Sequence, residues 1–203
     1  KNKLSGKHVG AYVSFDTNDN GLVEVKVSSS FISHEQAWIN LYRELPKSKK
    51  FDEILAEGRK SWNNELAKIK VKADNTDYGL SNKIKFYSCF YRTILFPRQF
   101  HEYNIDGEQI HYSPYNGEIL EGPLFTDNGF WDTFRAVFPF YTILYPEKLG
   151  EIMQGIMVNP YKESGWLPEW SSPGHRDCMI GSNSASIIAE AFLKGIKNFD
   201  IDV

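Results

Sequence analysis

Apolar and polar positions alternate along the first thirty residues. Val9, Ala11, Val13 and Phe15 fall on one face of an extended segment, and a second alternating run over 23–27 follows the break TNDNG. This pattern predicts a β-hairpin. A lone hairpin is only marginally stable in water, so we expect residues 1–32 to belong to a larger β-structure.

From Ser33 onwards the apolar spacing becomes helical. The segment SHEQ has the form of a capping box, with Ser33 as the N-cap and Gln36 three residues later. An apolar stripe follows, and a second helix is predicted over about 52–69. We interpret residues 33–78 as linker helices.

Four further segments have broad apolar faces at helical spacing: 82–96, 131–145, 147–158 and 184–195. Ser182 or Asn183 is the expected N-cap of the last helix and Gly195 its end, while Pro139 should kink or divide the second. Stacked helical hairpins with long loops at 97–128 and 159–182 are expected, and loops of this length usually carry function. The chain is thus predicted to be mainly α with a small β part. Because four helices would leave apolar flanks uncovered, we expect it to stop inside a larger structure.

Composition and charge narrow the classes of function. The chain has 203 residues, 41% of them hydrophobic, and its formal charge of −3 gives no electrostatic reason to expect nucleic acid or an anionic membrane as partner. No apolar run approaches the roughly 20 residues of a membrane span, and no targeting leader is evident. We expect Cys89 to be a buried free thiol and Cys178 to lie in a loop. Two cysteines leave the compartment undecided.

The aromatic content is unusually high, at 15%. Large rings fill cores, but they also provide flat faces on which sugars pack while the sugar hydroxyls find polar partners at the ring edge. The composition permits a glycan site without establishing one.

Two stretches combine rings with polar groups. GFWDTFR places Asp132 and Arg135 beside Trp131 at a helix start, as either a buried ion pair or the floor of a polar pocket. The loop ESGWLPEWSSPGHRDCMIGS holds Trp166, Glu169 and Trp170, followed by four polar residues at 175–178. Flat rings interleaved with groups that bind hydroxyls are what a monosaccharide pocket requires.

Other chemistries find little support. His175, Asp177 and Cys178 match no zinc spacing, and neither a serine-hydrolase elbow nor a phosphate-binding glycine loop is present. Glycosidases use two carboxylates, which lie roughly 6.5 to 9.5 Å apart in inverting enzymes. Sequence spacing cannot supply that separation, but five acids are candidates by location: Asp127, Asp132, Glu163, Glu169 and Asp177.

Three stretches together carry a family resemblance: FYSCFYRTILFPRQF, FTDNGFWDTFRAVFPFYTILYP and SGWLPEWSSPGHRDCMIGSNSASIIAEAFLKGI. They resemble the calcium-dependent, inverting exo-α-mannosidases of glycoside hydrolase family 92, often called α-1,2-mannosidases. The resemblance implies an N-terminal β-sandwich followed by an (α/α) six-hairpin toroid. Residues 1–32 would then be the last sandwich strands, 33–78 the linker helices and 79–203 the first part of the toroid.

The resemblance also implies a site. Seven residues would line the pocket for a terminal mannose: Trp131, Asp132, Arg135, Trp166, Glu169, Trp170 and Cys178. The family's acid and base lie in GNEP-type and GNDD-type motifs, which do not occur in this chain. No catalytic residue and no metal ligand is therefore expected here, and calcium would be bound mainly by residues downstream.

Partners, location and alternatives follow from the same resemblance. The expected partners are a mannose-containing glycan and the remainder of the same polypeptide. The full-length protein is expected to be secreted or periplasmic, with attachment to the cell surface left open. FTDNGF replaces a DFSLW-type lead-in to the motif, which leaves the accepted linkage open. The alternatives are a toroidal glycosidase of other specificity, such as a glucosidase or trehalase-like enzyme, and a non-catalytic carbohydrate-binding fragment.

Overall fold

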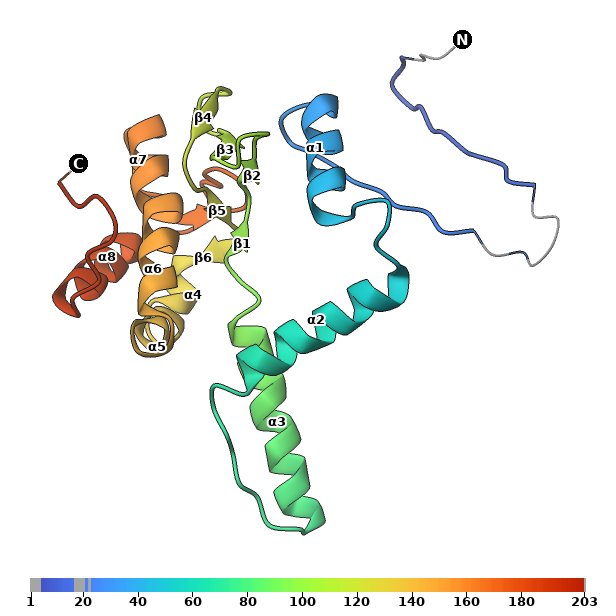
Figure 1. Cartoon of the computed structure of the whole chain (residues 1–203). Helices are drawn as coiled ribbons and strands as arrows, with labels where there is room; N and C mark the ends of the chain where they lie inside the picture. Colours follow the sequence, from blue (N-terminus) through green and yellow to red (C-terminus); the bar gives the residue numbers. More distant parts are fainter. Residues whose placement is uncertain (1–4, 17–20, 22, 203) are drawn as a thin grey trace.

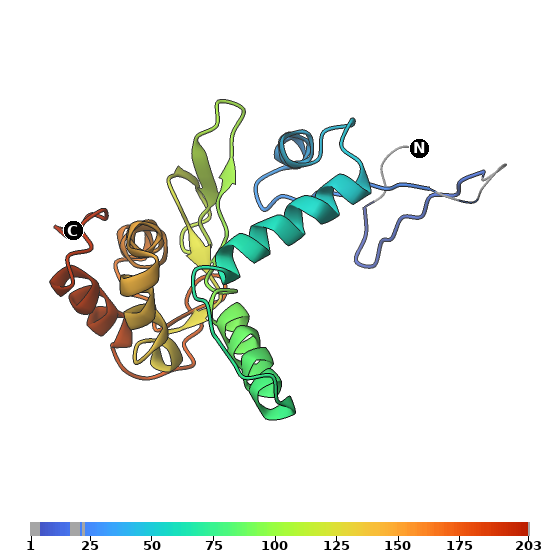
Figure 2. The ribbon, with the colours of Figure 1, turned by 60° about the horizontal axis from the view of Figure 1, so that its bottom comes forward.

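The protein is mainly helical with three small antiparallel sheets, as predicted. A computed structural model describes residues 5–16, 21 and 23–202. In both views the five C-terminal α-helices form one group, and the largest sheet stands between that group and α1 (Figures 1 and 2). In the described part of the chain, no helix has the length and apolar character needed to cross a membrane.

The predicted N-terminal hairpin is not formed. Its tip, 17–20 and 22, lies outside the described residues, and the structure has no strand in residues 5–16, 21 and 23–32. The apolar side chains of the expected strands are exposed, Val13 at 74% and Val27 at 78%. A two-stranded ribbon needs a surface on which to bury its apolar face, and these side chains have none here.

Helix α1 (His34–Glu44) begins at Ser33, as predicted, with the Ser33 Oγ accepting a hydrogen bond from the Gln36 N–H at 3.1 Å. The Gln36 side chain does not complete the predicted capping box. Its amide donates instead to the Tyr103 carbonyl at 2.7 Å, and Asn40 donates to Glu102 at 2.6 Å. These bonds hold α1 against strand β2.

Helices α2 (Phe51–Leu66) and α3 (Asp77–Thr93) match the predicted second and third helices within a few residues. They meet where Trp62 packs on Tyr91, with ring centroids 4.5 Å apart. The prediction that Cys89 is buried is wrong, because its side chain is exposed while Phe90 is buried. Cys89 lies four residues after Lys85 and three before Arg92, so it shares a side of the helix with these charged residues and faces solvent.

The predicted loop 97–128 contains five short strands. They form a meander in the order β2-β3-β4 and a separate pair, β1-β5. Their bounds are β1 (Arg98–Gln99), β2 (Glu102–Tyr103), β3 (Gln109–Tyr112), β4 (Ile119–Glu121) and β5 (Phe125–Thr126). Strands of two to four residues are too short to produce a recognisable alternation.

The core lies among the C-terminal helices, which pack around the buried side chains of Phe130, Phe138, Leu149, Met157 and Ile187. The bounds of these helices are α4 (Phe130–Thr133), α5 (Val137–Leu144), α6 (Pro146–Met153), α7 (Asn159–Ser164) and α8 (Asn183–Leu193).

Two predicted helix features are confirmed in this group. The predicted helix 131–145 is divided at 134–136, and Pro139 occupies the first turn of α5, where its missing N–H breaks no intrahelical bond. Helix α8 has Ser182 as its N-cap, and Gly195 follows it with a left-handed φ of 84°.

The predicted loop 159–182 begins as helix, because the π-helical segment η1 (Gln154–Val158) joins α6 directly to α7 (Figure 1). Strand β5 crosses this segment closely. A Cβ at Gly155 would lie 2.7 Å from Phe125 Cδ2 and 2.9 Å from the Pro123 carbonyl oxygen. Asn159 donates to the same carbonyl at 2.7 Å, so the strand is fixed on the helix from both sides.

Candidate functional site

The two stretches that the sequence singles out meet at a two-stranded sheet. Strand β6 (Asn128–Gly129) immediately precedes α4, and it pairs antiparallel with β7 (Trp170–Ser171). Gly129 is the partner of Trp170 in this register. The pairing therefore brings the WDTFR motif next to the LPEW loop, as the predicted pocket requires.

Asp132 and Trp170 lie on either side of Gly129. A Cβ at Gly129 would be 3.0 Å from Trp170 Cε3 and 3.2 Å from Asp132 Oδ2. A side chain at 129 would push the indole and the carboxylate apart. The glycine thus allows an aromatic face and an acid to approach each other closely.

The buried ion pair of Asp132 with Arg135, one of the two alternatives that the sequence left open, is not formed. Both residues are exposed, and among the described residues the Asp132 carboxylate has neither a side-chain hydrogen bond nor an ion pair. The Arg135 guanidinium lies over the rings of Trp131 and Phe134, at 5.1 and 5.0 Å from their centroids. Helix α4 ends at Thr133, so Arg135 lies outside it. Residues three apart are neighbours only within a continuous helix, and Arg135 is therefore not placed beside Asp132.

Asp127 is a candidate acid that already has partners. It adopts a left-handed φ of 62°, accepts a hydrogen bond from Ser172 Oγ at 3.0 Å and forms an ion pair with Arg98. This carboxylate links the junction of β5 and β6 to the segment after β7. Asp127 therefore has a structural role next to the site, and its carboxylate is not free to act as a catalytic acid.

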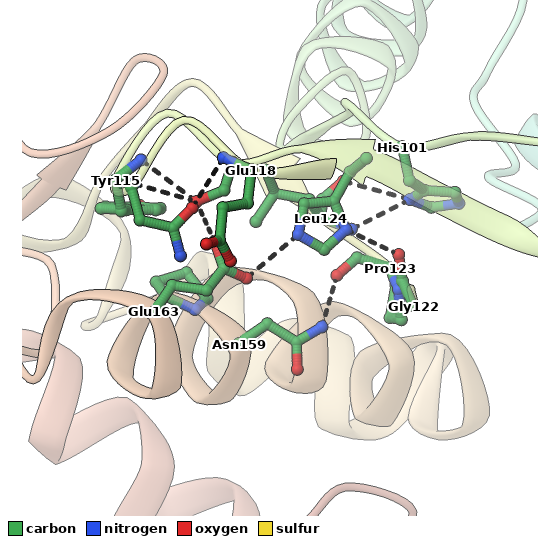
Figure 3. A network of polar contacts seen from close by, with 12 residues as sticks. His101, Tyr115, Glu118, Gly122, Pro123, Leu124, Asn159 and Glu163 are labelled. Atoms are coloured by element: carbon green, nitrogen blue, oxygen red, sulfur yellow. Dashed lines mark hydrogen bonds and ion pairs between the residues drawn. The ribbon is translucent and has the colours of Figure 1, made fainter. Parts of the chain in front are cut away.

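Glu163 is also held within the structure. Its Oε1 lies 3.0 Å from His111 Nε2, and its Oε2 accepts from Ser113 Oγ. Figure 3 shows Glu163 on the helix beneath the meander, in the same network as Asn159. With 6% of its side chain exposed, Glu163 connects α7 to the meander and does not face a ligand.

Glu169 is bound by its own loop. Its Oε1 accepts from the backbone N–H of Asp177 at 2.8 Å and of Arg176 at 3.2 Å, and its Oε2 lies 3.5 Å from His175 Nδ1. Burial alone would raise the pKa of this carboxyl. Its own backbone N–H, the two loop N–H groups and the imidazole outweigh burial and lower the pKa. A glycosidase general acid needs a raised pKa, so Glu169 is unsuited to that role.

The remaining predicted residues lie in exposed positions. Trp166 follows α7 and is 74% exposed, and Cys178 is exposed in the loop, as predicted. In the part of the chain that the structure describes, no side-chain hydrogen bond, ion pair or ring contact joins either of them to Asp132. The structure thus brings Asp132 and Trp170 together and leaves the other two at the edge of the site.

Tyr115 is a neighbour that the sequence did not reveal. Its ring packs edge-on against His175 with centroids 5.0 Å apart, and burial raises its pKa to about 12. It lies in the turn between β3 and β4, where nothing in the segment SPYNG signals a contact with a loop sixty residues further on. Across the described residues, no group of three or more His, Cys, Asp or Glu side chains is placed to hold a metal ion.

Comparison with known proteins identifies the family. The model of the glycosyl hydrolase family 92 catalytic domain matches residues 36–203. The chain belongs to glycosyl hydrolase family 92. Its mainly helical architecture with a small sheet part matches solved structures of that family.

Two solved relatives come from Bacteroides thetaiotaomicron. An inverting mannosidase of family 92 is 47% identical with a TM-score of 0.78, covering 85% of this chain and 23% of the relative. An α-mannosidase of family 92, solved in complex with mannoimidazole, is 28% identical with a TM-score of 0.73, covering 85% of this chain and 22% of the relative.

A curated relative from Arthroderma benhamiae, named an uncharacterized secreted glycosidase, is 27% identical over 201 residues. The match covers 96% of this chain and 21% of the relative. The chain therefore spans between a fifth and a quarter of the length of the family 92 relatives that it matches.

Proposed function

We propose that this chain forms part of the sugar pocket of a calcium-dependent, inverting exo-α-mannosidase of the α-1,2 type, which removes terminal mannose from glycans. Family membership supports this proposal, as does the description of both Bacteroides relatives as mannosidases. The observation that carries it is the pairing of Gly129 with Trp170, which sets the Asp132 carboxylate beside an indole ring.

Asp132 is the principal polar group of the proposed pocket. A carboxylate without internal partners accepts hydrogen bonds from two adjacent hydroxyls, and charge-assisted bonds of this kind are roughly twice as strong as neutral ones. The face of Trp170 packs against the C–H groups of the same sugar. Trp131 and Arg135 extend this surface on the α4 side, and Trp166 and Cys178 extend it on the loop side.

The rest of the polypeptide completes the enzyme. We place residues 1–32 in the end of a β-sandwich, 33–78 in the linker and 79–203 in the first part of an (α/α) toroid. The catalytic acid and base would lie in GNEP-type and GNDD-type motifs beyond this chain, together with most calcium ligands. Calcium would bind sugar hydroxyls and favour the transition-state ring shape.

The enzyme is proposed to act outside the cytoplasm, as a secreted or periplasmic protein. The name of the Arthroderma relative, a secreted glycosidase, supports this location. A toroidal glycosidase acting on glucosides has less support, because both Bacteroides relatives are described as mannosidases. A fragment that only binds carbohydrate is the remaining alternative.

The test is an assay of the full-length polypeptide on α-1,2-, α-1,3- and α-1,6-mannobiosides, with and without a calcium chelator. We expect mannose release that is fastest on the α-1,2 linkage and lost on chelation, with β-mannose as the first product by NMR. Release of glucose from α-glucobiosides assayed in parallel, with no mannose from the mannobiosides, would support the glucoside-acting alternative, and binding without hydrolysis would support the carbohydrate-binding one. Asp132→Asn should lower activity, whereas Asp106→Asn in the exposed β2–β3 turn provides the matched control.

A further inference from the structure

The segment from Glu169 to Asp177 folds back on itself. Ser171 bridges to His175, and the Ser172 N–H donates to the Gly174 carbonyl at 3.2 Å. Asp177 has a left-handed φ of 51°, a conformation that non-glycine residues seldom adopt without support. Interactions with other side chains are therefore needed to hold this loop in its conformation.

Glu169 supplies that support. Its Oε1 already accepts from the two consecutive N–H groups of Arg176 and Asp177, the second of which is the residue with positive φ. A carboxylate oxygen has two lone pairs, and both are engaged here. The second oxygen, Oε2, faces His175. The loop thus saturates Oε1, and only Oε2, which faces His175, keeps free lone pairs, whereas neither oxygen of Asp132 has a side-chain partner among the described residues.

His175 is itself fixed from two other sides. Its Nε2 lies 3.2 Å from Ser164 Oγ, at the end of α7, and its ring packs edge-on against Tyr115. Ser164 Oγ lies 2.7 Å from the Pro160 carbonyl oxygen and donates its hydrogen there, so it accepts from His175. The imidazole therefore connects the loop to α7 and to the β3–β4 turn.

Two buried polar atoms lie where the loop meets the β3–β4 turn. His175 Nδ1 and Tyr115 Oη are buried and have no hydrogen-bond partner among the described residues. His175 Nδ1 is in ion-pair range of Glu169 Oε2, at 3.5 Å, but does not form a hydrogen bond with it.

We propose that Glu169 and His175 are positioning residues, which hold the 172–178 loop so that Arg176, Asp177 and Cys178 are presented to the sugar, and that Glu169 does not itself bind sugar. This inference rests on the proposed mannosidase function. It changes the role of Glu169 from a ligand of the sugar to a support of the loop, and it adds His175 to the residues on which the site depends.

The first measurement is independent of catalysis. Hydrogen–deuterium exchange of the peptide spanning 172–178 in the full-length enzyme reports the two N–H groups that Glu169 binds. Glu169→Ala should make them exchange about tenfold faster or more, because the carboxylate is their acceptor. Glu169→Gln, which keeps an acceptor oxygen, should restore most of the protection. Glu44→Ala on the exposed end of α1 is the matched control.

The second measurement is kinetic. In Glu169→Ala we expect KM on a mannobioside to rise about tenfold while kcat changes less, with recovery in Glu169→Gln. Combining Glu169→Ala with His175→Gln should cost little more than Glu169→Ala alone, because the two residues act as one unit.

Several results would overturn the proposal. Unchanged amide exchange in Glu169→Ala would do so. A Glu169→Gln variant that keeps its amides protected but is as inactive as Glu169→Ala would also do so, because that result would indicate direct contact between Glu169 and the sugar. Faster exchange with normal kinetics would also contradict it. An enzyme without mannosidase activity would disprove the proposed function, and the role of the pair in presenting the loop to a sugar would be overturned with it. The exchange data would then still establish whether Glu169 holds the loop.

Discussion

Glu163 on α7 and His111 on β3 lie 3.0 Å apart, Oε1 to Nε2, and neither side chain is more than 6% exposed. The other nitrogen of His111, Nδ1, is 2.9 Å from the Gly122 carbonyl oxygen. Both ring nitrogens thus face acceptors, and Glu163 also accepts from Ser113. The pair connects the meander to the helix that leads into the site loop.

Removing the carboxylate should destabilise the domain. Glu163→Ala leaves a buried imidazole and a buried hydroxyl without their acceptor, at a cost of about 1–3 kcal/mol for each unsatisfied group. We expect a melting temperature several degrees lower by calorimetry of the full-length enzyme, and a smaller decrease for Glu163→Gln, which keeps the shape. Equal melting temperatures for Glu163→Ala and Glu44→Ala would show that the pair contributes nothing.

Asp132→Asn should lower activity without lowering stability. The carboxylate has no internal partner to lose, but a charge-assisted bond to a buried sugar hydroxyl is worth about 1.5–3 kcal/mol. That corresponds to a decrease in kcat/KM of roughly tenfold to a hundredfold. The melting temperature should match that of Asp106→Asn. A marked loss of stability with normal turnover would remove Asp132 from the pocket.

Gly129→Ala should disturb the site directly. The added Cβ would lie 3.0 Å from the Trp170 indole, closer than ordinary van der Waals contact, so the ring must move. We expect a higher KM on mannobiosides and a shift in tryptophan fluorescence. Gly58→Ala is the matched control, because nothing lies within 4 Å of its Cβ position on α2. Unaltered KM in Gly129→Ala would mean that the approach of Asp132 and Trp170 is irrelevant to binding.

Gly155→Ala tests the crossing of β5 over the π-helical segment. Its Cβ would lie 2.9 Å from a backbone carbonyl oxygen, which cannot move aside as the end of a flexible side chain can. Overpacking of this kind costs about 1–3 kcal/mol. The melting temperature should fall, whereas Gly58→Ala should raise it slightly, because alanine favours helix. A Gly155→Ala protein as stable as the wild type would contradict the tight crossing.

The stability of the protein should depend on pH through His101. Burial lowers the pKa of this imidazole from its usual value of 6.5, although the Leu124 carbonyl and Glu151 favour the charged form. The unfolded chain then binds a proton more readily than the folded one. Stability is highest above about pH 6.5 and falls as the pH drops toward the folded pKa. His101→Gln should flatten the fall in melting temperature between pH 7 and pH 5, whereas His8→Gln should leave it unchanged. An identical slope in both variants would refute this role for His101.

Local signals in the sequence predicted the helices well. Ser33 caps α1 and Gly195 ends the last helical segment because each acts within a few residues of its own position. The strands between 97 and 128 could not be predicted, since they are too short for a periodic pattern. Cys89 was misplaced because it lies on the side of the helix that carries Lys85 and Arg92. For the short strands, packing between distant segments decided the structure.

In the candidate site, too, the sequence indicated residue types but not which residues lie together. The residue types of WDTFR and LPEW indicated a sugar pocket, but the position of Asp132 and Trp170 near Gly129 depends on a strand pair only two residues long. The expected ion pair of Arg135 failed because the helix ends before it. The residue types led to the hypothesis of a sugar pocket, and the backbone geometry decided which of these residues lie together.

The pairing of Gly129 with Trp170 also couples the site to the folding of the chain. Gly129 precedes α4 and Trp170 follows α7, so the pairing of β6 with β7 closes a loop that contains α4, α5, α6, η1 and α7. Closing a long loop costs entropy that packing of the enclosed segment must offset. The approach of Asp132 to Trp170 therefore depends on the packing of these helices. A substitution in their core, such as Leu149→Ala, should reduce the fraction of molecules that bind sugar while leaving the affinity of the folded molecules unchanged.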